Sequence, residues 1–354
     1  MIFRGIQISK AFLNNRVIIG PMCQYSAHKG MPSKWHYKHL SSLTKLGASL
    51  LMIESTAVTR SGRITKKDLE LNKEAHSKAF FKLIKKIKTN NTKIGIQISH
   101  SGRKGSSEIP WIESNKSISK MKGGWSTYAP SPIRRSANWP IPKKLSLKEI
   151  KKLKKDFIKS AKLALKADFD CLEIHMAHGY LLHQFFSQIS NKRVDKYGGN
   201  LKNRTRLLLE ISQEIRKIWP EKKILGARIT GSDNLKGGIK IEDSIFLCRQ
   251  LKKIGLDYVA VTSGGILPKT NMKFFPGYQV KLAAKIKKKV DIKVVTLGMI
   301  NSKNLINKIL KGKLADLVAV SRRFINEPKW LLKKNSKPKR VKKSIIPKQY
   351  LRCF

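Results

Sequence analysis

The feature that most constrains the fold is a regular alternation between short apolar runs and longer amphipathic stretches. A short run rich in β-branched residues predicts a buried strand, and the amphipathic stretch after it predicts a helix. Eight such units imply a parallel sheet and favour an α/β fold closed as a (β/α)8 TIM barrel over an open sheet. The predicted strands are Val17–Gly20, Leu50–Glu54, Ile94–Ser99, Cys171–His175, Leu225–Ile229, Tyr258–Thr262, Lys293–Leu297 and Leu317–Val320.

The length of 354 residues suits one large barrel or two ordinary domains. No Gly-x-Gly-x-x-Gly follows the first predicted strand, which argues against a Rossmann domain. We therefore expect a single barrel domain over residues 1–332 and a basic C-terminal tail over residues 333–354. The predicted helices are Trp35–Leu46, Ala75–Lys88, Leu147–Ala167, Asn203–Ile218, Ile241–Ile254, Tyr278–Lys289 and Ser302–Leu310.

Two connections are too long to be simple links. Ser101–Ser146, rich in Gly, Pro, Ser and Trp, follows the third strand, and Thr262–Pro276 follows the sixth. Both leave the C-terminal ends of strands, where long ordered loops usually cap or shape an active site. Beyond Pro328 the pattern gives way to the basic segment Lys333–Lys343, for which disorder is the default expectation. The aromatic ending leaves room for a docked terminus.

The chain carries 75 Lys and Arg against 22 Asp and Glu, a formal net charge of +53. Such an excess raises nucleic acid or an anionic membrane as a partner. Here the lysines recur in helical patterns such as Lys151–Lys155, with little aromatic interleaving. This distribution favours solvated helix faces over a dedicated nucleic-acid surface. We expect no nucleic-acid or membrane partner, and a positive field that attracts a phosphorylated nicotinamide cofactor.

The four cysteines, Cys23, Cys171, Cys248 and Cys353, lie far apart and form no Cys-x-x-Cys pair. We therefore expect no zinc ribbon, iron–sulfur cluster or disulfide framework. Residues 1–16 contain charges and no sustained apolar segment that could serve as a signal peptide. No stretch elsewhere is long and apolar enough to span a membrane, so a cytoplasmic protein is predicted.

Two imidazoles and a phenol stand where the fourth predicted strand ends, in the stretch His175-Met-Ala-His178-Gly-Tyr180. The interior of a (β/α)8 barrel is filled with side chains, so reactive groups gather at the C-terminal ends of strands. The stretch therefore indicates a catalytic site. The alternative is that both histidines are hydrogen-bonded structural residues and that Tyr180 merely begins a helix.

Other predicted strands also end in polar or small residues, and the parallel arrangement brings these ends to one mouth. A phosphate site built by the seventh and eighth loops recurs in this fold, and Gly298 with Arg322 offers close backbone approach and a bidentate guanidinium. The set is typical of a site for a phosphorylated ring cofactor, with a structural glycine and a surface arginine as the alternative. Its members are Gly20, Pro21, Met22, Cys23, Gln24 and Tyr25, then Ser55, Gln97, His100 and Arg228, then Gly298, Ser321 and Arg322.

Four stretches carry a family resemblance: Pro21–Tyr25 (PMCQY), Gly95–Lys104 (GIQISHSGRK), Glu173–Leu181 (EIHMAHGYL) and Asn191–Arg204 (NKRVDKYGGNLKNR). They resemble, in order, the Old Yellow Enzyme family of FMN-dependent NAD(P)H oxidoreductases, and the likeness runs from about residue 2 to residue 330. Cys23 with Tyr25, and the ending Gln-Tyr-Leu-Arg, are similar to the thermophilic-like subclass, which includes bacterial NADPH dehydrogenases and xenobiotic reductases.

The resemblance implies that FMN lies over the barrel mouth with its phosphate near Gly298, Ser321 and Arg322. The family usually has Gly where Ser321 stands; a serine still offers its backbone N–H. The resemblance also implies that Gln97 hydrogen-bonds the pyrimidine edge of the flavin and that Arg228 faces the ring atoms where negative charge develops on reduction. The implied cradle is completed by Gly20, Pro21, Met22, Cys23 and Ser55, with Cys23 tuning the flavin rather than acting as a nucleophile.

The implied reaction is ping-pong: NADPH or NADH reduces the flavin, and an α,β-unsaturated carbonyl compound then reoxidises it. His175 and His178 would hydrogen-bond the carbonyl oxygen, and Tyr180 would protonate the α-carbon. Tyr25 and Arg352 would line the substrate pocket. In the subclass that the ending resembles, the terminal arginine comes from a neighbouring subunit, which implies a homodimer or a homotetramer.

Two other functions stay open at this point, and a third has little support. The same flavin site could reduce nitro compounds or nitroesters. The +53 charge leaves room for a barrel that binds RNA or another anion without catalysis. A metal-dependent hydrolase built on His175 and His178 lacks carboxylate partners at neighbouring strand ends.

Overall fold

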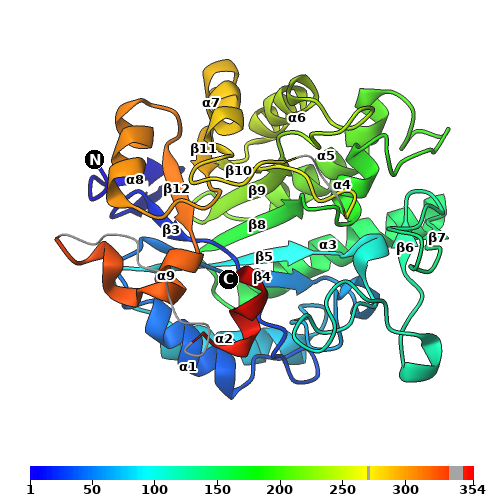
Figure 1. The fold of residues 1–354 in the computed structure, drawn as a ribbon, viewed down its shortest axis with the longest axis horizontal. Helices are drawn as coiled ribbons and strands as arrows, with labels where there is room; N and C mark the ends of the chain where they lie inside the picture. Colours follow the sequence, from blue (N-terminus) through cyan, green and yellow to red (C-terminus); the bar gives the residue numbers. More distant parts are fainter. Residues whose placement is uncertain (269–271, 335–345) are drawn as a thin grey trace.

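A closed barrel of parallel strands forms the centre of the computed structural model, which describes residues 1–268, 272–334 and 346–354 (Figure 1). Around the barrel the strands follow the chain order, and β12 pairs with β3 to close it. The predicted (β/α)8 barrel is therefore confirmed. The barrel strands are β3 (Val17–Ile19), β4 (Leu50–Ala57), β5 (Lys93–Ser99), β8 (Cys171–Met176), β9 (Ile224–Thr230), β10 (Tyr258–Thr262), β11 (Lys293–Thr296) and β12 (Leu317–Val320).

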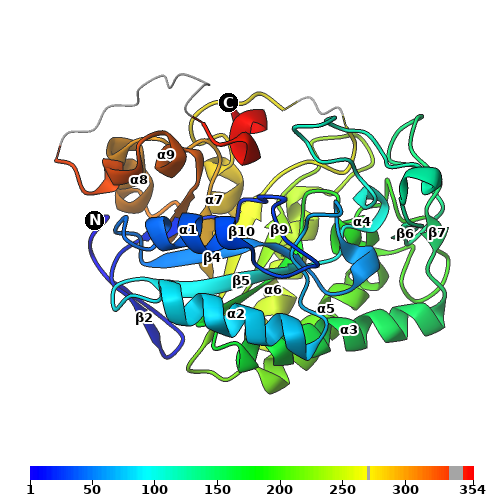
Figure 2. The ribbon, with the colours of Figure 1, turned by 90° about the horizontal axis from the view of Figure 1, so that it is seen from below.

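Amphipathic helices cover the outside of the barrel, and Figure 2 shows α1, α2 and α3 packed side by side along one flank. All seven predicted helices form, with ends displaced by a few residues. The short helices α4 and α9 were not predicted. The helices are α1 (Lys34–Leu43), α2 (Glu74–Ile87), α3 (Leu147–Lys166), α4 (Leu181–Phe186), α5 (Leu201–Ile218), α6 (Ile241–Ile254), α7 (Val280–Lys289), α8 (Lys303–Lys311) and α9 (Arg322–Asn326).

A hairpin that the sequence pattern did not predict closes the N-terminal end of the barrel. Its strands, β1 (Ile6–Ile8) and β2 (Ala11–Leu13), pair antiparallel. The inward side chains Ile6, Ile8 and Leu13 belong to one hydrophobic cluster with Leu50, Cys171, Tyr258 and other interior residues of the barrel strands. This apolar plug leaves the opposite, C-terminal end as the open mouth.

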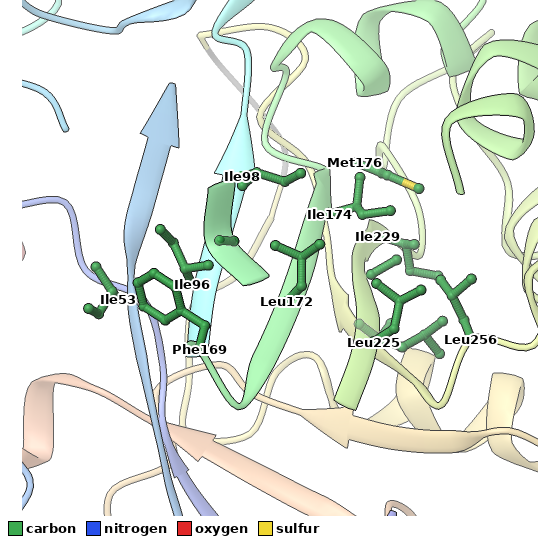
Figure 3. Close-up of a cluster of buried hydrophobic side chains, with 14 of the residues drawn as sticks. Ile53, Ile96, Ile98, Phe169, Leu172, Ile174, Met176, Leu225, Ile229 and Leu256 are labelled. Carbon is green, nitrogen blue, oxygen red and sulfur yellow. The ribbon is translucent and has the colours of Figure 1, made fainter. Parts of the chain in front are cut away.

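Strand β8 shows how the fold separates core from site. Successive side chains of a strand point to opposite faces. Leu172, Ile174 and Met176 point outward into the layer between the strands and the helices, where Figure 3 shows them beside Ile98 and Ile229. The alternate residues of β8 therefore face the barrel interior. Among them, Glu173 and His175 carry polar side chains, and both are almost completely buried.

Described parts of the two long connections and of the C-terminal segment lie at the mouth, where Lys104 contacts His178, Gly265 packs on Gly179 and Arg352 lines a cavity. Ser101–Ser146 contains the paired two-residue strands β6 (Tyr128–Ala129) and β7 (Lys143–Lys144). Most of the predicted basic segment Lys333–Lys343 lies outside the described residues. The last residues are described, and a 3-10 turn at Lys348–Cys353 places the buried Tyr350 against the barrel. No helix of the described residues is long and apolar enough to cross a membrane.

Candidate active site

Two adjoining cavities open at the C-terminal ends of the barrel strands. The larger, of about 410 Å³, is lined by Gly20, Gly298 and residues of the segment after β12. The smaller, of about 250 Å³, lies over β5 and β8. They share His178, Arg228, Ser321 and Arg322. The smaller cavity collects the remaining predicted residues Pro21, Met22, Cys23, Ser55, Gln97, His175, Tyr180 and Arg352. Tyr25 lines neither cavity, and His100 is a buried residue whose Nδ1 accepts from the backbone of Gly102.

Two glycines in close quarters shape the larger cavity. A Cβ atom at Gly20 would lie 2.9 Å from Oγ of Ser321. Gly298 has a φ of +106°, a left-handed conformation that favours glycine. Arg322 is exposed beside these two turns. Close backbone approach next to an exposed guanidinium fits a phosphate group, and the serine at position 321 does not fill this space.

Arg228 places a positive charge where both cavities meet. Its Nε atom is buried and has no hydrogen-bond partner among the described residues. Burial lowers the pKa of Arg228, and the nearby carboxylate of Glu173 opposes that shift. A buried guanidinium with an unused donor is costly unless a ligand compensates it. This orphaned donor, beside the glycine-lined cavity, fits an anionic ring system such as a reduced flavin.

His175 and His178 are held as neutral imidazoles facing each other. The backbone N–H of Ala177 donates to Nδ1 of His175 at 3.2 Å, so the ring proton of His175 resides on Nε2. That Nε2 lies 3.3 Å from Nδ1 of His178. Burial, followed by the charge of Arg228, lowers the pKa of both rings well below the usual value for histidine. Both rings are therefore neutral at neutral pH. Nε2 of His178 also lies 3.0 Å from the Thr262 hydroxyl, so a bound oxygen competes with these partners for the N–H groups of the two rings.

Tyr180 packs edge-on against His175, with 4.9 Å between the ring centroids. The preceding turn sets its position. Gly179 has a positive φ, and a Cβ there would lie 2.1 Å from the carbonyl oxygen of Gly265. The N–H of Gly179 also donates to Nδ1 of His183 at 2.7 Å, and Nε2 of His183 lies 2.9 Å from Asp233. Burial raises the pKa of the Tyr180 phenol, so the group stays protonated.

Lys104 is a functional candidate that the sequence reasoning missed. Its Nζ lies 5.2 Å from the centre of the Tyr180 ring and donates to the carbonyl oxygen of His178 at 2.8 Å. Burial, reinforced by the charge of Arg135, lowers the pKa of Lys104 to about 7. In the sequence, Lys104 is noticeable only as the last residue of Gly95–Lys104, one of the stretches that resemble the family. That position does not predict a contact with Tyr180.

Glu54 is a second missed residue, and it positions the loop after β3. The pairing register of β4 and β5 shifts between Ile53 and Ser55, so Glu54 occupies an irregularity in the strand. Its carboxylate accepts from the backbone N–H of Gln24 at 2.7 Å and lies 3.1 Å from Nε2 of His36. The PMCQY loop is thereby attached to both β4 and α1.

Cys23 lies in the smaller cavity as a thiol rather than a thiolate. Burial raises its pKa to about 12. Nucleophilic attack requires the thiolate, so this environment does not favour a covalent role. The predicted tuning role stays a prediction.

The C-terminal segment docks on the mouth of its own chain. The Arg352 guanidinium lies 4.8 Å from the centre of the Tyr25 ring. The Tyr350 hydroxyl lies 2.7 Å from Nε2 of His39, and Gln349 donates to Ser26. The structure thus unites Tyr25 and Arg352 within one chain. A contribution from a neighbouring subunit stays a prediction.

Comparisons with known proteins identify the family of this chain. Residues 1–340 match the model of the NADH:flavin oxidoreductase / NADH oxidase family. The chain is 38% identical over 344 residues to an NADH:flavin oxidoreductase of Gibberella zeae, covering 92% of this chain and 83% of that protein. It is 36% identical over 357 residues to an NADPH dehydrogenase of Clostridium acetobutylicum, covering 100% of this chain and 99% of that protein.

Solved structures share the fold. An old yellow enzyme homologue from Zymomonas mobilis superposes with a TM-score of 0.81 at 22% identity, covering 99% of this chain and 98% of that one. Morphinone reductase gives a TM-score of 0.76 at 22% identity, covering 92% and 86%. The family model and the relatives above 30% identity go further than the fold. The chain belongs to the NADH:flavin oxidoreductase / NADH oxidase family, the Old Yellow Enzyme family, and is an FMN-dependent enzyme that oxidises NADPH or NADH.

Proposed function

We propose that this enzyme is an ene-reductase that reduces the activated C=C bond of α,β-unsaturated carbonyl compounds. One observation carries the proposal: His175, His178 and Tyr180 line the same cavity of about 250 Å³ as Gln97 and Arg228. Two imidazoles that can donate to a substrate oxygen, and the protonated phenol of Tyr180, therefore lie beside the residues that fit the flavin. FMN bound at this mouth would supply the hydride transfer from the nicotinamide to the β-carbon of the alkene.

The imidazoles bind the carbonyl oxygen of the substrate. His175 can donate from Nε2, because its Nδ1 already accepts from Ala177. Negative charge grows on the carbonyl oxygen as hydride reaches the β-carbon, so N–H donors aimed at that oxygen bind the transition state more strongly than the substrate. Because both imidazoles are neutral, they stabilise this charge without giving up a proton.

Tyr180 supplies the proton to the α-carbon. The phenol is protonated at neutral pH, and its ring lies 4.9 Å from that of His175, beside the place of the carbonyl group. The Lys104 ammonium, 5.2 Å from the ring, stabilises the phenolate that forms. Arg352, which lines this cavity and covers the ring of Tyr25, borders the substrate. We further propose that the enzyme acts as a homodimer or homotetramer.

The test is the visible spectrum of the purified holoenzyme. Under anaerobic conditions, NADPH should bleach the flavin bands. Addition of 2-cyclohexenone should then restore them at a rate no slower than steady-state turnover. Nitrobenzene or a nitroester, added in place of the enone, tests the alternative activity, the reduction of nitro compounds or nitroesters. The flavin could instead be bleached by NADPH, stay bleached with the enone and recover its bands with a nitro compound. This result would refute the ene-reductase proposal in favour of nitroreduction.

A further inference from the structure

We propose that Glu173 is a positioning residue for the flavin: its carboxylate fixes the Gln97 amide so that the amide oxygen faces the mouth. The inference rests on FMN binding at this mouth and is independent of which acceptor the reduced flavin serves. Gln97 lines the smaller cavity, whereas Glu173 does not. Glu173 thus acts on the site through Gln97.

The three residues form a hydrogen-bonded series across the barrel interior. Nε2 of Gln97, on β5, donates to Oε1 of Glu173, on β8, at 2.6 Å. The Tyr258 hydroxyl, on β10, donates to Oε2 of the same carboxylate at 2.9 Å. All three side chains are buried, with relative exposures of 2%, 3% and 2%. At this depth no solvent competes for these groups.

The phenol of Tyr258 reaches Glu173 because β9 makes room for it. Tyr258 stands directly across from Gly226 in the pairing of β10 with β9. A Cβ at Gly226 would lie 2.2 Å from the Tyr258 ring. The absence of a side chain at Gly226 therefore leaves the space that the Tyr258 ring fills. This packing fixes the position of the Tyr258 hydroxyl relative to Glu173.

The orientation of the Gln97 amide follows from the chemistry of its partner. An ionised carboxylate only accepts hydrogen bonds, so the amide must turn its NH2 group toward Glu173. Its oxygen is then the group that Gln97 can present to the cavity. The pyrimidine edge of a flavin carries one imide N–H between two carbonyl groups. An amide oxygen accepts a hydrogen bond from that N–H. An amide NH2 in its place would put two donors against each other, and no hydrogen bond would form.

Two hydrogen-bond donors and one cation surround the carboxylate of Glu173, and this geometry favours its ionised form. Burial raises the pKa of Glu173, while the positive charge of Arg228 and the hydrogen bonds from Gln97 and Tyr258 oppose that shift. The other titratable neighbour is Cys171, whose Sγ lies 3.7 Å from the Tyr258 hydroxyl. Two donors converge on the carboxylate oxygens, the arrangement that an anion requires.

The experiment exchanges donor and acceptor. Glu173→Gln turns one of the two accepting oxygens, which meet Gln97 and Tyr258 separately, into an amide NH2 donor, so the Gln97 amide is no longer fixed in one orientation. The dissociation constant of FMN, measured by equilibrium dialysis of the holoenzyme, should rise by about tenfold or more. The double variant Glu173→Gln with Gln97→Glu restores the pair with reversed polarity and keeps a carboxylate oxygen toward the cavity. Its FMN affinity should return to within about threefold of the parent value.

A matched control separates this role from a general effect of removing a carboxylate. Glu210 accepts from a tyrosine hydroxyl, Tyr197 at 3.0 Å, and from Lys154 at 2.8 Å, on the outer helix α5. Glu210→Gln should leave the FMN dissociation constant unchanged. If Glu173→Gln also binds FMN as the parent does, or if the double variant is no better than the single one, the proposal is overturned.

A second measurement needs no variant. FMN methylated at the imide nitrogen lacks the N–H that the Gln97 oxygen accepts, so the parent enzyme should bind it at least about tenfold more weakly than FMN. Equal affinity for the two flavins would overturn the proposal even if Glu173→Gln fails to fold. A parent enzyme that discriminates between the flavins but does not reduce enones would refute the ene-reductase function and leave the role of Glu173 standing.

Discussion

Desolvation sets the protonation of the single groups at the mouth. It raises the pKa of Cys23 and Tyr180 and lowers the pKa of His175 and His178, so each of these groups is neutral at neutral pH. Positive charge comes from Arg228, Arg322 and Arg352 and, near neutral pH, from Lys104. A site of neutral donors beside a buried guanidinium is suited to charge that appears only during the reaction.

Replacing Tyr180 tests the proton donor. Tyr180→Phe keeps the ring against His175 and removes the hydroxyl, so the enone-dependent reoxidation of the flavin should slow by about 100-fold or more. Reduction of the flavin by NADPH, which needs no proton from Tyr180, should change little. Stopped-flow absorbance of the two half-reactions provides the measurement. An unchanged reoxidation rate would remove Tyr180 from the mechanism.

Lys104 should give the reoxidation step a pH dependence near neutrality. Below pH about 7 the side chain is an ammonium that stabilises the developing Tyr180 phenolate; above it the amine is neutral and this help is lost. The charges of Arg135, Arg103 and Arg352 lower the pKa of Lys104 in the same direction as burial does.

The rate of reoxidation should therefore fall by about tenfold as the pH rises through this value. Lys104→Met should be slow throughout and lack the step. If Lys104→Met shows the same inflection in the pH profile of reoxidation as the parent, the inflection belongs to another group.

At the scale of elements, the alternation along β8 and the pairing of β9 with β10 decide what reaches the mouth. The strands were predictable from the sequence, because each is a short apolar run between amphipathic stretches. The complementarity of Gly226 and Tyr258 was not, because the two residues are neighbours only through the parallel register.

Gly226→Ala should destabilise the barrel, because the new methyl group overlaps the Tyr258 ring. We expect a loss of about 1–3 kcal/mol in the free energy of unfolding, measured by urea denaturation of the holoenzyme. Tyr258→Leu in the same chain should recover part of the loss, since the smaller side chain leaves room for the methyl group. Equal stability of Gly226→Ala and the parent would contradict the tight packing.

At the scale of the whole molecule, the last nine residues lie far from the active-site strands in sequence and complete their mouth. Tyr350 is 2% exposed, and Arg352 covers Tyr25. The family-like ending predicted that Arg352 reaches a substrate pocket. No local pattern could say which subunit's pocket it enters, since that depends on the path of residues between the barrel and the terminus.

Removal of residues 352–354 should raise the KM for an enone by about fivefold or more, while the melting temperature stays within a few degrees, because the buried Tyr350 anchor remains. Removal of residues 346–354 should lower both affinity and stability. Steady-state kinetics and thermal denaturation measure the two effects. An unaltered KM in the shorter deletion would exclude Arg352 from the substrate pocket.

Mixing chains tests where Arg352 acts. If it serves a neighbouring subunit, a mixture of Arg352→Ala chains and Tyr180→Phe chains regains one intact site in each mixed dimer. If it serves its own chain, each site keeps one defect and the mixture gains no activity.

The sequence by itself determined the (β/α)8 barrel, because eight apolar runs separated by amphipathic stretches have few other ways to bury their surfaces. It also determined the residues at the strand ends, from the histidine pair and Tyr180 to Gln97 and Arg228, because strand ends are local features. Only the tertiary structure decided which partners these residues have. Lys104 under Tyr180, Glu54 behind the first loop and Glu173 behind Gln97 act across strands. Such contacts depend on register and side-chain direction, which distant segments set together.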